Sequence, residues 1–146
     1  MHQVGCNRYA MTTSKMIGWI DDRGRPLINL QSPNGTSVSA LVDTGFNGEI
    51  LVEGQNYDRL VDADFPCHLT TLFRRVEAVG AAPYARLGLA RVQWHDDERI
   101  VNLQVVLNPE HAFHRGDPIV TVGTRFLIDS RLTIDFPEQF VTVEKV

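Results

Sequence analysis

The sequence predicts a single, mostly β domain with one or two helical turns, and three observations support this fold class. Over most of the chain, apolar residues alternate with polar ones or form short apolar runs, as they do in β-strands. Gly, Pro, Asn and Asp residues bound these segments and favour turns. A length of 146 residues suits one domain and not two. Residues 1–15 lack the strand pattern, so we expect a loose tail there and the domain over residues 16–146.

The first part of the domain predicts three strands joined by tight turns, which is a β-meander. The strands are expected at residues 16–20, 27–30 and 36–42. Asp, Gly and Pro residues separate the first two strands. The Asn34-Gly35 pair before the third strand favours a two-residue hairpin turn.

The middle of the chain predicts a short helix between strands. A short strand is expected at residues 49–52, and the apolar spacing within residues 57–61 favours one or two helical turns. Two long strands follow at residues 73–79 and 84–94, joined by small residues. A third strand is expected at residues 100–107, after a polar turn.

The last part of the chain predicts three strands and a short helix. A strand at residues 119–122 leads into Gly123, and residues 124–128 are expected to form the helix. Alternating apolar residues predict strands at residues 132–136 and 141–144.

Composition argues against several classes of partner. With 14 basic and 18 acidic side chains the formal net charge is −4, which offers no broad positive field for nucleic acid. No apolar run approaches the length of about 20 residues that spans a bilayer, and no secretory signal is evident, so we expect a cytoplasmic protein with no membrane partner. Cys6 and Cys67 have no metal-ligand spacing and are expected to be reduced thiols, with a bridge between them as the alternative.

The segment with the clearest chemical meaning is residues 40–48, in which Asp43 follows an apolar strand. Gly45 and Gly48 let the backbone turn sharply after it. One carboxylate alone cannot both activate a water and protonate a leaving amine, whereas two carboxylates that share one proton can. A C₂ dimer would supply the second copy of Asp43 at the two-fold axis.

The sequence resembles the retropepsin-like (clan AA) aspartic proteases, specifically their short bacterial single-domain members. Residues 41–48 match the family's apolar-apolar-Asp-Thr-Gly-Phe-x-Gly run. Residues 76–89 match the position of its flap hairpin. Residues 120–128 and 132–136 match its apolar run into Gly, its helical turn and its Leu-x-Ile-Asp-Phe strand. The match covers residues 16–146.

This resemblance implies a closed or sandwiched β-barrel with a flap hairpin and one short C-terminal helix, active as a homodimer on an extended peptide. Asp43 would be catalytic, Thr44 would lie at the dimer axis, and Gly45 would let the peptide pass close to the carboxylates. The residues implied near the flap tip are Gly80, Ala81, Ala82, Pro83 and Tyr84. No metal or other cofactor is implied. One departure from many family members is that Gly123 is followed by Thr124 and Arg125 rather than by a charged pair.

The residues of the main motif also have a simpler interpretation. Asp43 would be a turn aspartate that caps the backbone, with Thr44 and Gly45 as ordinary turn residues. On the same fold, the protein would then be a non-catalytic dimeric module that binds peptides without cutting them. His111 and His114 have the spacing of two metal ligands, but they lack the acidic base of a zinc protease and are interpreted as solvated loop histidines.

Four other features leave similar alternatives. Arg74 and Arg75 either meet an acidic partner or form a solvated strand edge, the usual place of paired arginines on a strand. Tyr84 is either a flap residue or a strand aromatic. His95, followed by three acidic residues, is interpreted as part of a polar hairpin turn rather than a cation site. Trp94 is expected to anchor the core or an interface.

Overall fold

The computed structural model describes residues 14–75, 84–106 and 118–146. It is mostly β, with 59% of residues in strands, which confirms the predicted fold class, and its described part contains one helix. The elements in chain order are β1 (Lys15–Ile20), β2 (Pro26–Gln31), β3 (Ser37–Val42), β4 (Ile50–Glu53), α2 (Gly54–Asp62), β5 (Cys67–Arg75), β6 (Tyr84–Trp94), β7 (Asp97–Val106), β8 (Val120–Val122), β9 (Ser130–Asp135) and β10 (Phe140–Lys145).

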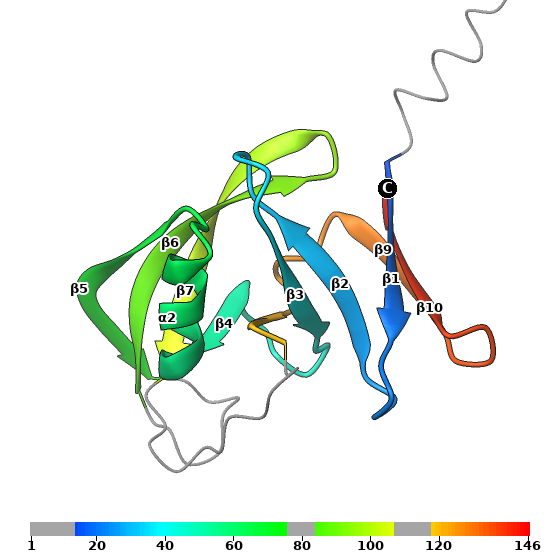
Figure 1. The fold of residues 1–146 in the computed structure, drawn as a ribbon, viewed down its shortest axis with the longest axis horizontal. Helices are drawn as coiled ribbons and strands as arrows, with labels where there is room; N and C mark the ends of the chain where they lie inside the picture. The colour runs from blue at the N-terminus through cyan, green and yellow to red at the C-terminus, as the bar shows by residue number, and fades with distance from the viewer. Residues whose placement is uncertain (1–13, 76–83, 107–117) are drawn as a thin grey trace, which may run out of the picture.

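Six of the strands close into a β-barrel (Figure 1). Around the barrel the strand order is β6, β7, β4, β8, β3 and β2. The pairing of Gln31 in β2 with Gln93 in β6 completes the circle. Strand β5 extends the sheet beyond β6, while β1, β10 and β9 extend it beyond β2. The helix α2 contacts β4 and β7 on the outside of the barrel.

The predicted meander is confirmed, because β1 pairs with β2 and β2 with β3, both antiparallel. Its second turn differs from the prediction, since residues 32–36 form a longer connection than a two-residue hairpin turn. The Asn34 side chain accounts for the difference: its Oδ1 accepts from the Thr36 N–H at 3.0 Å, and its Nδ2 donates to the Asp64 carbonyl at 2.9 Å. The turn is therefore tied to the end of α2 instead of closing only on itself.

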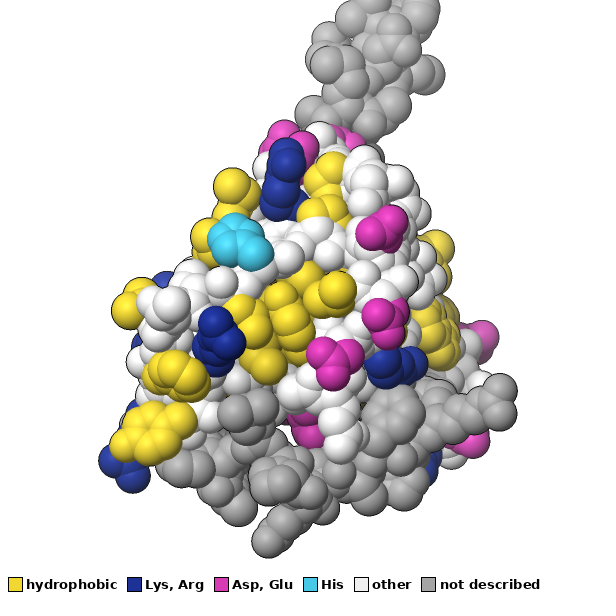
Figure 2. Space-filling model, turned by 60° about the vertical axis from the view of Figure 1, so that its left-hand side comes forward, with side chains coloured by type: hydrophobic (Ala, Val, Ile, Leu, Met, Phe, Trp, Pro, Cys, Tyr) yellow, Lys and Arg dark blue, Asp and Glu magenta, His cyan; other side chains and the backbone are white. Residues whose placement is uncertain are grey.

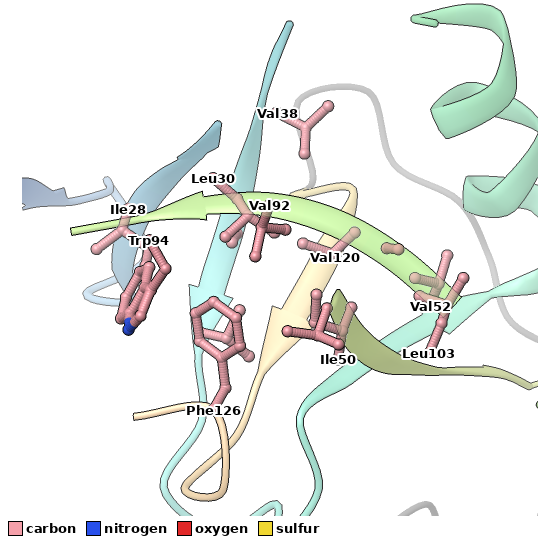
Figure 3. Close-up of a cluster of buried hydrophobic side chains, with 14 of the residues drawn as sticks. Ile28, Leu30, Val38, Ile50, Val52, Val92, Trp94, Leu103, Val120 and Phe126 are labelled. Atoms are coloured by element: carbon pink, nitrogen blue, oxygen red, sulfur yellow. The ribbon is translucent and has the colours of Figure 1, made fainter. Parts of the chain in front are cut away.

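The core fills the barrel and is built from alternate residues of its strands (Figure 3). Trp94 and Phe126 are its largest fully buried side chains, and their ring centroids lie 4.3 Å apart at a tilt of 57°. Their burial confirms Trp94 as a core anchor and places the segment after Gly123 against the barrel. The side chains labelled with them in Figure 3 are Ile28, Leu30, Val38, Ile50, Val52, Val92, Leu103 and Val120.

The predicted helix at residues 124–128 is wrong, because the structure has a series of turns there. The Leu127 N–H donates to both the Gly123 carbonyl (3.3 Å) and the Thr124 carbonyl (3.1 Å). The Ser130 N–H donates to the Leu127 carbonyl at 2.9 Å and begins β9. Since β9 begins at Ser130, the segment between Gly123 and β9 is too short for a regular helix.

Three other element bounds differ from the prediction. The helix α2 spans nine residues, longer than the expected one or two turns, with Leu60 buried against the core. Strand β5 begins at Cys67, six residues earlier than expected, because Cys67 and Leu69 pack against the core before a β-bulge breaks the alternation. Strand β7 begins at Asp97, which leaves His95 and Asp96 as a two-residue turn.

Candidate active site

Asp43 is exposed and directly follows β3, at the end of the barrel where β3 and β8 run in parallel. Its N–H donates to the Val122 carbonyl at 3.0 Å. The last residue of β8 is therefore bonded to the residue that follows β3. Because β3 and β8 are parallel neighbours in the sheet, the residues that follow them, Asp43 and Gly123, lie at the same end of the barrel.

A tight turn orients the Asp43 carboxylate. Its Oδ1 accepts from the Gly45 N–H at 2.9 Å, and its carbonyl accepts from the Phe46 N–H at 3.2 Å. Phe46 is buried, so it anchors the turn in the core while Thr44 and Gly45 stay exposed. The turn leaves the carboxylate facing solvent with one oxygen held by the backbone.

The segment that starts at Gly123 holds this turn from the other side. The Gly123 N–H donates to the Glu49 carbonyl (3.0 Å), and the Arg125 N–H donates to the Gly48 carbonyl (3.2 Å). Thr124 donates twice to the Phe46 carbonyl, from its N–H at 2.9 Å and from its Oγ1 at 3.3 Å. These bonds make residues 43–49 and 123–125 one unit.

Two residues that the sequence did not single out fasten this unit to β7. The Glu49 carboxylate accepts from the Asn102 N–H at 3.0 Å and from the Asn102 side-chain amide at 2.8 Å. Both bonds join residues 53 positions apart. No local pattern marks either residue, since an acid after Gly and an Asn in a strand are both common on surfaces.

An ion pair between Arg99 and Asp129 also holds the turns that follow Gly123. The Arg99 guanidinium binds the Asp129 carboxylate and donates to the Phe126 carbonyl at 3.5 Å. The Trp94 Nε1–H also donates to Asp129, at 3.3 Å. Burial alone would raise the pKa of Asp129, but the hydrogen bonds from Arg99 and Trp94 and the Arg99 charge hold that pKa below its ordinary value. The pair therefore links β7 to the turns after Gly123.

His95 and Ser130 lie beside this ion pair without forming a catalytic triad. The His95 Nε2 is 2.9 Å from the Ser130 Oγ, which donates to Asp129 at 3.2 Å. In a Ser-His-Asp triad the carboxylate holds the imidazole, whereas here it contacts the serine and the His95 Nδ1 is buried without a partner in the described structure. The expected polar hairpin turn is present, with the His95 ring half-buried in it.

The structure brings Asp43, Thr44 and Gly45 together on one exposed turn. Tyr84, the last of the expected flap residues, is exposed at the start of β6 opposite Arg75. The other four, Gly80, Ala81, Ala82 and Pro83, lie outside the described residues, as do Cys6, His111 and His114.

The described residues include no group of three or more His, Cys, Asp or Glu side chains placed to hold a metal ion. Over the same residues, no helix has the length and apolar character needed to cross a membrane. No family model matches the sequence, and no curated protein matches it either. The site is therefore interpreted from its own geometry.

Proposed function

We propose that this protein is an aspartic endopeptidase that works as a homodimer, with one Asp43 from each chain at a shared site. The observation that carries the proposal is the Asp43 turn itself: an exposed carboxylate at the end of a buried strand, held by the Gly45 N–H and braced by the backbone of residues 122–125. The bond from the Gly45 N–H is also the cap expected of a simple turn aspartate, so the proposal depends on the brace from residues 122–125. The resemblance of residues 41–48 to the retropepsin-like motif supports the same interpretation.

The proposed chemistry needs two carboxylates that share one proton. The ionised Asp43 takes a proton from a water molecule, whose oxygen attacks the scissile carbonyl carbon. The protonated Asp43 of the second chain polarises the carbonyl oxygen of the substrate. Protonation of the amide nitrogen then lets the C–N bond break, which leaves a carboxylic acid and an amine. The resemblance implies no metal, nucleotide or covalent intermediate in this route.

The surface around Asp43 supports a two-fold interface. Thr44, Thr124 and Arg125 are exposed beside it. Ile128, in the same series of turns, is 81% exposed, which is the highest value among the large apolar side chains of the described residues. We place Ile128 in this proposed interface, where a second copy would cover it. In such a dimer the two Asp43 side chains would meet at the two-fold axis.

The substrate that fits this arrangement is an extended peptide. Gly45 is exposed and has no side chain, so a peptide backbone can approach the carboxylates. The resemblance implies that Gly80, Ala81, Ala82, Pro83 and Tyr84 lie near the tip of a flap over this peptide.

The test is cleavage of a peptide library by the wild-type chain and by Asp43→Asn, with sedimentation of both. We expect cleavage by the wild type only, and dimers for both chains. Asp62→Asn, which changes an exposed aspartate on α2, is the matched control and should cleave normally. Wild-type turnover by Asp43→Asn would contradict the proposal. A chain that retains peptides without cutting them would instead be the non-catalytic binding module.

A further inference from the structure

The outer end of β5 has an unusual surface for a protein with a net charge of −4. Leu72 and Phe73 are 62% and 61% exposed, and Arg74 and Arg75 follow them, also exposed. Neither arginine pairs with a carboxylate of the described residues. In Figure 2 the side of the molecule that carries β5 comes forward, and hydrophobic side chains there lie beside Lys or Arg side chains.

One side of this segment pairs with no described strand. β5 is the first strand in the sheet order, and among the described strands it pairs only with β6. The regular register of residues 73–75 with residues 84–86 means that alternate residues turn their N–H and C=O groups away from β6. Such an edge can add an extended peptide as a further strand. We call residues 72–75 the β5 edge.

A β-bulge limits the edge to a short stretch. Between Leu69 and Phe73 the register shifts, and the Leu72 N–H is used by the Thr70 Oγ1 at 3.1 Å. Bulges of this kind protect strand edges from non-specific pairing. Only a few main-chain hydrogen bonds are left for a ligand, so its affinity has to come largely from side chains.

The strand at the other end of the sheet order does not share these features. β9 carries charges of both signs, Arg131 and Asp135, and its apolar Leu132 and Ile134 are half-buried against the core. The β5 edge has one sign of charge together with exposed apolar groups. On the partner strand, Tyr84 lies opposite Arg75 and Arg86 lies opposite Phe73, which repeats the pairing of an aromatic ring with a cation.

We propose that the β5 edge docks an extended, acidic segment of the protein substrate. Arg74 and Arg75 turn to opposite faces of the strand, so each binds a carboxylate on its own face. Phe73 and Tyr84 contact apolar side chains of the segment on the face of Arg75. Arginine suits this ligand because its planar guanidinium binds carboxylates in a bidentate manner. The identity of the ligand as a substrate segment rests on the proposed function, whereas the docking itself does not. The net negative charge of the chain disfavours a nucleic acid in its place.

The test measures binding without cleavage, in the full Asp43→Asn chain. The probe is a fluorescein-labelled peptide in which adjacent pairs of Glu, one on each face of the strand, are separated by Val and Phe. Its binding is followed by fluorescence anisotropy. Its counterpart has Lys in place of Glu. We expect the acidic peptide to bind and the Lys peptide not to bind. Arg74→Glu with Arg75→Glu should weaken binding about tenfold, and added salt should weaken binding to the unchanged arginines.

Arg131→Glu on β9 is the control, because it reverses an exposed arginine on the other terminal strand, and it should leave the affinity unchanged. Arg74→Glu and Arg75→Glu made singly match it in charge change. Equal binding of the Lys peptide, equal loss in the Arg131 variant, or stronger binding of oligothymidylate than of the acidic peptide would overturn the inference. If the wild type cleaves peptides but the arginines do not affect binding, the docking inference falls and the proposed function stands. If binding depends on the arginines but the wild type cuts no peptide, the docking inference stands and the proposed function falls.

Discussion

Gly123 and Phe46 meet so closely that residue 123 has no room for a side chain. A Cβ at Gly123 would lie 2.4 Å from the Phe46 carbonyl oxygen and 2.5 Å from that of Gly48. Real Cβ atoms do not approach backbone atoms so closely. The close approach lets Thr124 donate twice to the same Phe46 carbonyl. A glycine is therefore required here by packing, in a position that holds the Asp43 turn.

The first prediction is that Gly123→Ala disturbs the Asp43 turn. The added methyl group must displace backbone, so the free energy of unfolding should fall by about 1–3 kcal/mol. Because displacements near 1 Å can cost about 100-fold in rate, peptide cleavage should fall by about that factor. Urea unfolding and cleavage assays measure the two effects.

Gly24→Ala is the control for this prediction. Gly24 has a φ of +77°, and a Cβ at this position would have no atom within 4 Å, so alanine there strains the backbone without a clash. It should lower stability through strain alone but leave cleavage by the folded protein unchanged. Normal cleavage by Gly123→Ala would show that the close contact with Phe46 is not needed for the site.

The second prediction concerns the ion pair between Arg99 and Asp129. Asp129→Asn removes the charge that binds Arg99 and should lower the free energy of unfolding by about 1–2 kcal/mol. Because the folded-state pKa of Asp129 lies below its ordinary value near 3.8, its contribution is present above that pH and is lost as the pH falls further. Wild type and variant should therefore converge in stability in acid, as urea unfolding at several pH values would show.

The exposed pair between Arg91 and Glu98 on the same hairpin is the comparison. Glu98→Gln should change stability by less than about 0.5 kcal/mol, because exposed pairs contribute little. If Glu98→Gln lowered the free energy of unfolding as much as Asp129→Asn, the pair of Arg99 with Asp129 would be no more important than an exposed pair.

The third prediction is a pH dependence from His95. Burial lowers the pKa of His95, and the charges of Lys145 and Arg99 act in the same direction, against those of Asp129 and Asp96. The unfolded chain then takes up the proton at a higher pH than the folded chain, so stability should fall as the pH drops below about 6.5. His95→Asn, which suits the positive φ of 55°, should flatten this dependence.

His68→Asn is the matched control, because His68 is exposed on β5. This variant should keep the slope of the wild type in urea unfolding at pH values on both sides of about 6.5. A wild-type slope in His95→Asn would show that another group causes the pH dependence.

The fourth prediction is that Ile128→Asp weakens the proposed dimer. A charge in place of an apolar contact at the centre of an interface costs at least about 2 kcal/mol, or about 30-fold in Kd. Because the side chain is 81% exposed within one chain, the fold should be intact. Sedimentation should show monomers at concentrations where the wild type is dimeric, and cleavage should return as the protein concentration rises. Ile100→Asp, at a 65% exposed position on β7, should leave the dimer unchanged.

The sequence predicted those elements that follow from local pattern. Strand β6 has the predicted bounds, and the polar turn at residues 95–96 ends it where the turn residues predict. The meander, and an exposed Asp43 after a buried strand, follow from alternation and turn residues in the same way. The alternation of apolar and polar residues and the placing of turn residues involve only a few neighbouring positions, so they can be seen in a single sequence.

The features that the sequence missed depend on partners far along the chain. Residues 124–128 are expected to form a helix, but they form turns that are bonded to Phe46 and Gly48, and β9 already begins at Ser130. The bond from Glu49 to Asn102 and the pair of Arg99 with Asp129 join residues 53 and 30 positions apart. Only the closed barrel brings such residues together, so no short window of sequence could show them.

The central claim, that each site needs one Asp43 from each of two chains, is tested most directly by mixing subunits. Wild-type and Asp43→Asn chains are unfolded together in equal amounts, refolded, and assayed for total cleavage. If the site is shared, only dimers of two wild-type chains cleave, so total activity should be about one quarter of that of the same total amount of wild-type protein. Activity of about one half, as expected when every chain carries a complete site, would contradict it.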